Sequence, residues 1–198
     1  MDMNKKEALE LLHSKMQNQN LRRHCYAVGA VMKALAKHFS KGEVSSVAKA
    51  MEETWEIVGL LHDGDYEETK NTPELHTLKM VEWLEQRGDI KKEILDAILS
   101  HNYAHTGQNP PKNNLEWSLY CCDELTGLIV AVALVKPDKK LASVSLDSII
   151  SKWKSPSFAA GVKREQIEEC QHRLGIPLND FIQIALTAMQ SISKDLGL

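Results

Sequence analysis

Histidine and aspartate residues recur along this chain in or beside segments with a helical pattern, and the adjacent pair His62-Asp63 stands out among them. Neutral imidazole nitrogens and carboxylate oxygens are the ligands that Mn, Fe, Zn or Ni ions take in proteins. An aspartate beside a histidine adds negative charge, which offsets a cation and can bridge two of them. The other candidate ligands are four histidines and one aspartate: His24, His76, His101, His105 and Asp123.

The helical pattern indicates which of these side chains point inward. His24 lies one turn before Val28, so it shares the apolar face of its segment. His62-Asp63 ends the next segment, where the partial negative charge of a helix C-terminus favours a cation. Asp123 lies in an apolar segment, and because burying an uncompensated carboxylate is costly, it should be exposed, paired or coordinating. The spacing alone leaves open an ion pair for Asp123 and a plain helix end at His62.

The elements that must position these residues are all predicted to be helices, and no convincing strand pattern is present. The fold class is therefore all-α. We expect a single domain over residues 1–198, with a metal-binding core at about 18–136 and a C-terminal helical subdomain at about 143–198. Gly64 is expected to end the third helix in the left-handed conformation, with a polar loop over 65–72. The predicted helices are 7–16, 21–39, 44–61, 73–86, 90–103, 115–135, 145–153, 156–160, 163–174 and 178–192.

Composition limits the class of protein. The chain has 198 residues, 43% hydrophobic and 26% charged, as in ordinary soluble globular proteins. A net charge of −3 gives no broad basic field, so bulk binding to nucleic acid or to an anionic membrane is not indicated. No signal peptide is recognisable, and the most apolar stretch, 125–135, is too short to span a bilayer. We expect a cytoplasmic protein whose four cysteines are reduced.

The order His24, His62-Asp63, Asp123, spread over helical segments between about Leu21 and Val135, resembles the HD-domain superfamily of metal-dependent phosphohydrolases. In that family the order is His, His-Asp, Asp, and the four side chains hold one metal ion inside a helical bundle. The resemblance implies an HD-domain bundle, here with additional C-terminal helices.

Binuclear members of that family add histidines between the doublet and the last aspartate, and His76 and His101 match that pattern. Asp63 would then bridge two ions, and His105 is a further candidate. The chain lacks the Gly-Tyr-Pro element of cyclic-di-GMP phosphodiesterases and the long insertions of large dNTP triphosphohydrolases. Its sequence over 60–67 and 123–131 is similar to small bacterial or archaeal HD hydrolases.

The resemblance implies hydrolysis of a nucleotide or other small phosphoester, with one or two divalent ions per chain (Mn, Fe, Zn, Ni, Co or Mg). His62 and Asp63 would be catalytic, with Asp63 orienting or deprotonating a water whose pKa the cation lowers. Phosphate also needs positive charge from the protein. Lys152 and Lys154 are the preferred pair, because Trp153 between them could stack on a base. The wider set is Lys136, Lys139, Lys140, Lys163 and Arg164.

Two other classes of protein fit the same residues. One is a non-catalytic binding module that kept the fold and a structural metal, although such a module has no need of Asp63 beside His62. The other is a binuclear iron oxygenase with the same helical ligand pattern. Metal analysis with a phosphatase panel separates the three, while the oligomeric state stays open.

Overall fold

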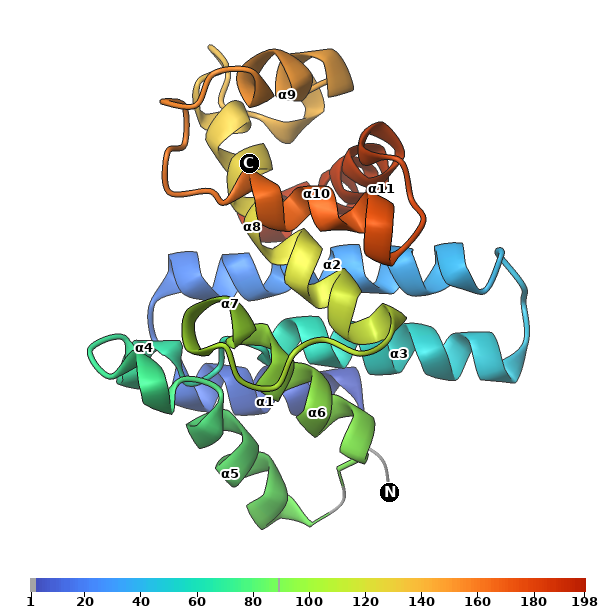
Figure 1. Cartoon of the computed structure of the whole chain (residues 1–198), viewed down its shortest axis with the longest axis vertical. Helices are drawn as coiled ribbons and strands as arrows, with labels where there is room; N and C mark the ends of the chain where they lie inside the picture. Colours follow the sequence, from blue (N-terminus) through green and yellow to red (C-terminus); the bar gives the residue numbers. More distant parts are fainter. Residues whose placement is uncertain (1–2, 89) are drawn as a thin grey trace.

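A long helical hairpin forms the centre of the molecule in the computed structural model, which describes residues 3–88 and 90–198. Its arms are α2 (Gln19–Phe39) and α3 (Ser46–Leu61), which lie side by side in Figure 1. The Asn18 side chain caps the start of α2, and the Ser45 side chain caps α3. A Cβ atom on Gly59 would lie 2.7 Å from the Cα of Gly29, so the two backbones touch at this crossing.

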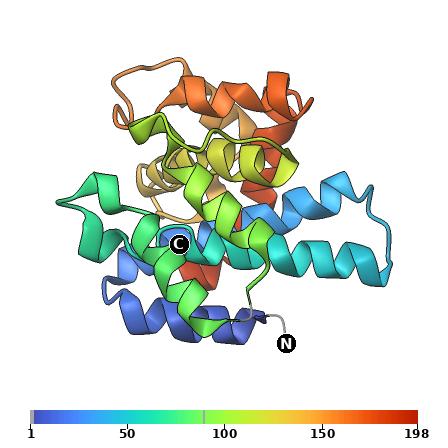
Figure 2. The ribbon, with the colours of Figure 1, turned by 60° about the horizontal axis from the view of Figure 1, so that its bottom comes forward.

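The remaining helices pack on both sides of this hairpin. Helix α8 (Asn114–Leu134) runs obliquely across α2, with α10 (Arg164–Arg173) against α8 and α11 (Leu178–Ser191) against α2. Figure 2 shows α1 and the α10–α11 pair at opposite edges of the molecule. The other elements are α1 (Lys5–Lys15), α4 (Tyr66–Thr69), η1 (Pro73–Leu75), α5 (Leu78–Arg87), α6 (Lys92–His101), α7 (Tyr103–Thr106), η2 (Leu141–Ser143), α9 (Leu146–Trp153) and α12 (Ser193–Leu196).

Helix α8 is the core helix that carries Asp123. Among the described residues it is the one helix long and apolar enough to cross a membrane, but more than half of that stretch is buried inside the protein. Its buried residues include Leu119, Cys122 and Leu125, which belong to one continuous apolar core with residues of α2 and α3. Burial on several sides therefore explains its apolar sequence.

The described residues contain no strand, which confirms the all-α prediction, but four local predictions were wrong. The expected loop over 65–72 contains the short helix α4, and the helix expected from Pro73 is interrupted after η1. Residues 156–160 form turns. Gly64 is not left-handed; a Cβ atom there would lie 2.5 Å from the sulfur of Met80, which would have to shift.

Candidate metal centre

Three side chains from different helices meet where α2, α3 and α8 cross. His24 comes from α2, His62 directly follows α3, and Asp123 comes from α8. The Nε2 atom of His24 lies 2.8 Å from Oδ1 of Asp123 and 3.3 Å from Nε2 of His62. One potential ligand atom from each of the three lies within 4.8 Å of the others, which suits a shared cation. We call His24, His62 and Asp123 the first group.

A second set of side chains lies on the other side of Asp63. The Nε2 atoms of His76 and His101 lie 3.2 and 3.3 Å from Oδ1 of Asp63. His76 follows η1, and His101 is the last residue of α6. We call Asp63, His76 and His101 the second group.

Asp63 is the residue that connects the two groups. While its Oδ1 atom faces the second group, its Oδ2 atom lies 3.6 Å from Nε2 of His24 and 3.7 Å from Nε2 of His62. The two oxygens of one carboxylate thus face different sets of imidazoles, as a carboxylate that bridges two cations must. The structure therefore brings six of the seven candidate ligands into the two groups.

Hydrogen bonds behind the first group fix its imidazole rings. The Nδ1–H of His62 donates to the Gly59 carbonyl at 2.8 Å. The Thr126 hydroxyl donates to the Asp123 carbonyl at 2.8 Å, so it accepts from Nδ1 of His24, which lies 3.3 Å away. With Nδ1 used in this way, each ring turns Nε2 toward the centre, the arrangement in which metal-bound histidines are held.

The second group is supported by Asp65, and its position behind His76 was not predicted from the sequence. Its carboxylate is fully buried and accepts a hydrogen bond from Nδ1 of His76 at 2.7 Å. The other oxygen accepts from the backbone N–H of Met80 at 3.1 Å, which ties α5 to the site. A carboxylate behind a histidine is typical of metal sites. The available signal was the short spacing Asp63-Gly-Asp65 before a histidine.

The remaining ring of the second group is held differently. Nδ1 of His101 is buried and has no hydrogen-bond partner in the part of the chain that the structure describes. The ring packs edge-on against His62, with 4.7 Å between centroids, and against His76, with 5.4 Å. Ring packing and the contact of Nε2 with Asp63 therefore orient His101, with no hydrogen bond behind the ring among the described residues.

Burial and mutual attraction govern the charges in the cluster. Burial opposes charge on Asp63 and Asp123, but the neighbouring histidines hold the pKa of both carboxyls well below the usual range. Burial likewise opposes charge on His24 and His76, yet their bonded aspartates raise the pKa of each to about 9. Without a cation, protons on histidines balance the buried carboxylates; a divalent cation can replace them.

The donor set fits a metal ion. It combines four imidazoles with two carboxylates, and within residues 3–88 and 90–198 neither of these carboxylates forms an ion pair with a lysine or an arginine. Imidazole nitrogen suits Zn, Fe, Co and Ni, and carboxylate oxygen also suits Mn and Mg. The chemistry of the site therefore matches the divalent ions expected from the sequence.

The cluster opens into a cavity of about 320 Å³. Tyr66 stands at its wall with its ring edge-on to His76, and His105, Glu124 and Val162 line it as well. His105 thus lies at the cavity and outside both groups. Glu67 does not line it, because its carboxylate accepts hydrogen bonds from the backbone N–H groups of residues 17 and 18.

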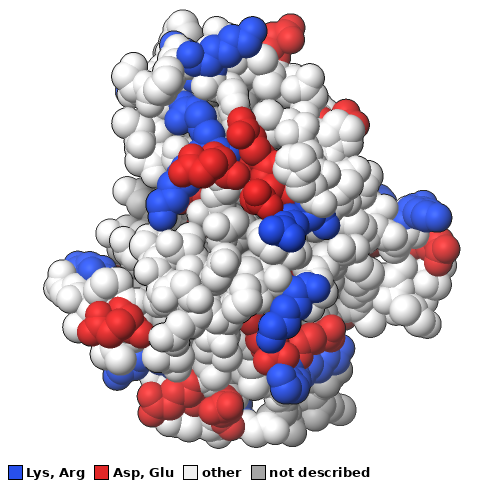
Figure 3. Space-filling view, in the orientation of Figure 1, with Lys and Arg blue, Asp and Glu red and all other residues white. Residues whose placement is uncertain are grey.

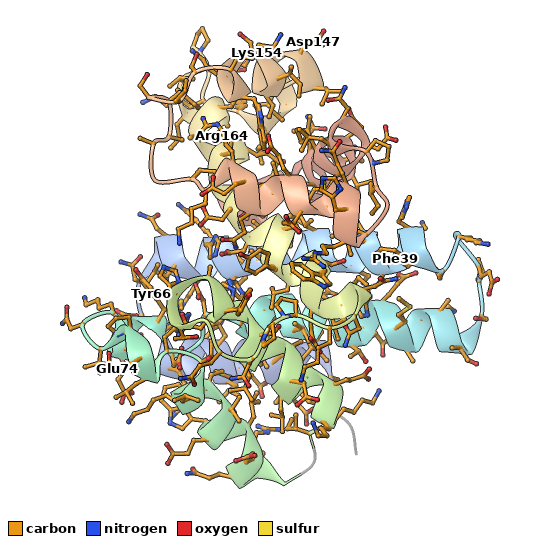
Figure 4. All side chains as sticks on the ribbon, in the orientation of Figure 1. Phe39, Tyr66, Glu74, Asp147, Lys154 and Arg164 are labelled. Atoms are coloured by element: carbon orange, nitrogen blue, oxygen red, sulfur yellow. The ribbon has the colours of Figure 1, made fainter. Side chains whose placement is uncertain are left out.

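The lysines expected to meet phosphate lie elsewhere. Lys154 stands near Asp147 at the far end of the molecule from Tyr66 (Figure 4). The Nζ atom of Lys152 lies over the Phe158 ring, and neither lysine lines the cavity. Trp153 has the guanidinium of Arg164 on its ring, 5.9 Å from the centroid.

Lys163 lies at the rim of the cavity, next to two of the residues that line it. Its Nζ atom lies 3.5 Å from Nε2 of His105, and its backbone N–H donates to the Glu124 carboxylate at 3.2 Å. The face drawn in Figure 3 mixes basic and acidic side chains without a broad field of one sign. Positive charge for an anionic ligand must therefore be supplied locally.

Comparison with models of protein families matches residues 21–134, more than half of the chain, to the HD domain. No curated protein and no solved structure matches the chain. The matched stretch contains both groups of candidate ligands, in the order His, His-Asp, Asp with two further histidines between. The chain therefore belongs to the HD-domain superfamily, whose members are metal-dependent hydrolases.

Proposed function

We propose that this protein is a metal-dependent phosphohydrolase that acts on a nucleotide or another small phosphoester. The observation that carries the proposal is the position of Asp63, with one oxygen toward His24 and His62 and the other toward His76 and His101. A carboxylate shared in this way suits two cations held side by side, the arrangement used for displacement at phosphorus. We expect the enzyme to work in the cytoplasm.

His24, His62 and Asp123 would hold one divalent ion, and His76 and His101 a second, with Asp63 shared. Bound cations lower the pKa of water and neutralise phosphate oxygens as charge develops. Because both Asp63 oxygens face imidazoles, its main task is to hold and bridge, and His62 serves as a ligand fixed by the Gly59 carbonyl.

The remaining residues at the cavity bind and orient the substrate. Lys163 at the rim can donate to a phosphate oxygen, because an ammonium is a strong partner for this group. Tyr66 and Val162 contribute apolar surface to the cavity lining, and a substrate that covers this surface excludes water, which strengthens electrostatic interactions inside the cavity. These assignments replace Lys152 and Lys154 with Lys163 as the phosphate partner.

The test combines metal analysis with an activity panel. Protein loaded separately with Mn, Fe, Co, Ni, Mg or Zn should approach two ions per chain and release phosphate from nucleotides, sugar phosphates or aryl phosphates. His76→Ala and His101→Ala should bind one ion. A stoichiometry of one that neither variant changes would leave a mononuclear enzyme. Absence of hydrolysis with every metal would contradict the proposal.

A binuclear iron oxygenase is the second candidate, favoured by the four imidazoles in the ligand set, since imidazole-rich sites suit iron. Oxygen consumption by the iron-loaded protein, with no phosphate release under any metal, would favour the oxygenase. If neither reaction occurs while metal is retained, a binding module becomes the better account.

A further inference from the structure

A second cavity adjoins the metal centre on the other side of His24. Its volume is about 490 Å³, and it shares two lining residues with the metal cavity, His24 and Gly127. Its walls are mainly apolar, with Val130 and Leu134 from α8 and Leu196 from α12. This size and character are typical of a site for a small organic molecule.

Gly127 lies at the boundary between the two cavities, because it lines both of them. It lies in α8 one turn after Asp123, and a Cβ atom there would meet nothing within 4 Å. Packing therefore does not require a glycine here, and inside a helix glycine costs about 0.5–1 kcal/mol relative to alanine. Such a glycine has a use if a ligand passes beside the helix at this point.

An arginine without a partner lies at the second cavity. Arg23 lines it, and no hydrogen bond or ion pair of its side chain is found within the described residues. Its neighbour Arg22 differs, because that guanidinium donates to the carbonyls of Met16 and His13. The Arg23 guanidinium lies against Gly197. It is free to donate to an acceptor on a bound molecule.

We propose that the substrate spans both cavities: its phosphate lies at the metal centre, and its organic part passes Gly127 into the second cavity. The substrate class is then a phosphoester of a bulky, largely apolar group of about nucleoside size, with a hydrogen-bond acceptor for Arg23. This inference rests on the proposed function, because it places the phosphate at the metal centre. Small polar phosphoesters would leave the apolar walls in contact with water and bind weakly.

Val130→Trp is the direct test, because Val130 lines the second cavity and not the metal cavity. The matched control is Val135→Trp, one residue past the end of α8, where the side chain is 57% exposed and lines neither cavity. The assay compares kcat/KM for naphthyl phosphate and a nucleoside monophosphate with kcat/KM for glycerol phosphate. Metal content and circular dichroism are measured in parallel. If Val130→Trp does not fold, Leu134→Trp at the half-exposed helix end takes its place.

We expect the wild type to prefer the bulky esters by about tenfold or more, and Val130→Trp to remove most of that preference with metal content unchanged. Val135→Trp should keep the preference. Arg23→Ala should raise KM for the nucleoside monophosphate, which has acceptor groups, and not for naphthyl phosphate. Equal kcat/KM values for bulky and small esters, in the wild type and in Val130→Trp alike, would overturn the inference. The proposed function would still stand in that case.

Phosphonate binding decides the inference if no phosphoester is hydrolysed and the proposed function fails. Naphthylmethylphosphonate and methylphosphonate are then titrated into the Mn-loaded protein by calorimetry. A preference for the bulky phosphonate that Val130→Trp removes would support a ligand spanning both cavities. Equal affinities, or a preference that this variant leaves intact, would overturn it.

Discussion

The two groups of candidate ligands are held by different kinds of backbone. In the first group, His24 and Asp123 lie inside the long helices α2 and α8, and hydrogen bonds fix the second nitrogen of both imidazoles. In the second group, His76 lies between η1 and α5, next to Thr77 with φ of 70°, and His101 ends α6 with its Nδ1 unpartnered.

This difference has a consequence for metal binding. In the first group two of three ligands lie inside packed helices and both rings are fixed by hydrogen bonds, so they lose little freedom when a cation binds. In the second group both histidines lie at the ends of short elements, and within the described chain only the His76 ring is fixed by a hydrogen bond behind it. We therefore expect the first position to bind its ion more tightly than the second. Asp63 contributes to both metal positions, so a substitution there should affect both ions at once.

Asp63→Ala is expected to have the largest effect. It removes a ligand from both positions, so hydrolysis should fall by at least about a thousandfold, the scale of losing an essential group. Asp63→Asn keeps the shape and loses the charge that binds cations, so it should lose most activity and part of the metal. Steady-state kinetics and elemental analysis check both variants. Substantial activity in Asp63→Asn with two ions bound would contradict the bridging role.

Asp65→Asn should act on the second position alone. It keeps an oxygen near His76 but weakens the charge that orients the ring, and changes at such residues cost about 10–100-fold in metal affinity. Thr126→Val is the matched change behind the first group. Calorimetric titration with Mn should show Asp65→Asn weakening the weaker step and Thr126→Val the tighter one. The reverse assignment would contradict the comparison.

Lys163→Ala should raise KM for phosphoesters by about tenfold, in line with the loss of a hydrogen bond to a charged group. Metal content should not change, because Lys163 lies at the rim beside His105, outside both groups. Lys152→Ala serves as the control and should leave KM within error, since Lys152 packs over Phe158. A larger effect from Lys152→Ala than from Lys163→Ala would restore the original expectation.

The smallest expected effect is a dependence of the stabilisation by Mn on pH. It should have the same direction for both groups, because each contains a histidine whose pKa is raised. His24 and His76 have pKa values raised to about 9 from 6.5, so their stabilisation of the metal-free protein is full below about pH 6.5 and is lost as pH rises through 9. Because protons compete with the cation, the rise in Tm caused by Mn should be a few degrees greater near pH 8.5 than near pH 6.5. Thermal unfolding with and without Mn measures it; an equal or smaller rise near pH 8.5 would contradict it.

The sequence could predict those parts of the site that depend on local helical spacing, and not those that depend on contacts between separate segments. The inward position of His24 follows from helical spacing, which is a local property, whereas spacing left Asp123 open between an exposed, a paired and a coordinating carboxylate. The bonds from His62 to Gly59 and from His76 to Asp65 depend on ring orientation and on an irregular turn, and spacing alone does not determine either. His76 was expected on a helix, but the chain breaks there so that Asp65 can reach both His76 and Met80.

Lys152 and Lys154 do not line the cavity, for a reason of longer range. The Arg164 guanidinium donates to the carbonyls of Trp153, Ser155 and Phe158, which fixes the turn after α9. Lys154, which directly follows α9, consequently stands at the far end of the molecule (Figure 4). Lys163, just before α10, lies beside the cavity, where its backbone N–H donates to Glu124. One guanidinium that collects several backbone carbonyls leaves no periodic signal in a sequence.

The most direct test of the central claim is anomalous scattering from crystals of the Mn-loaded protein. We expect two peaks in each chain, one between His24, His62 and Asp123 and the other between His76 and His101, with Asp63 between the two ions. At limiting Mn the first peak should be the stronger, because helix-held ligands are the more fixed. A single peak at saturating Mn, or two peaks of which neither contacts Asp63, would contradict the account.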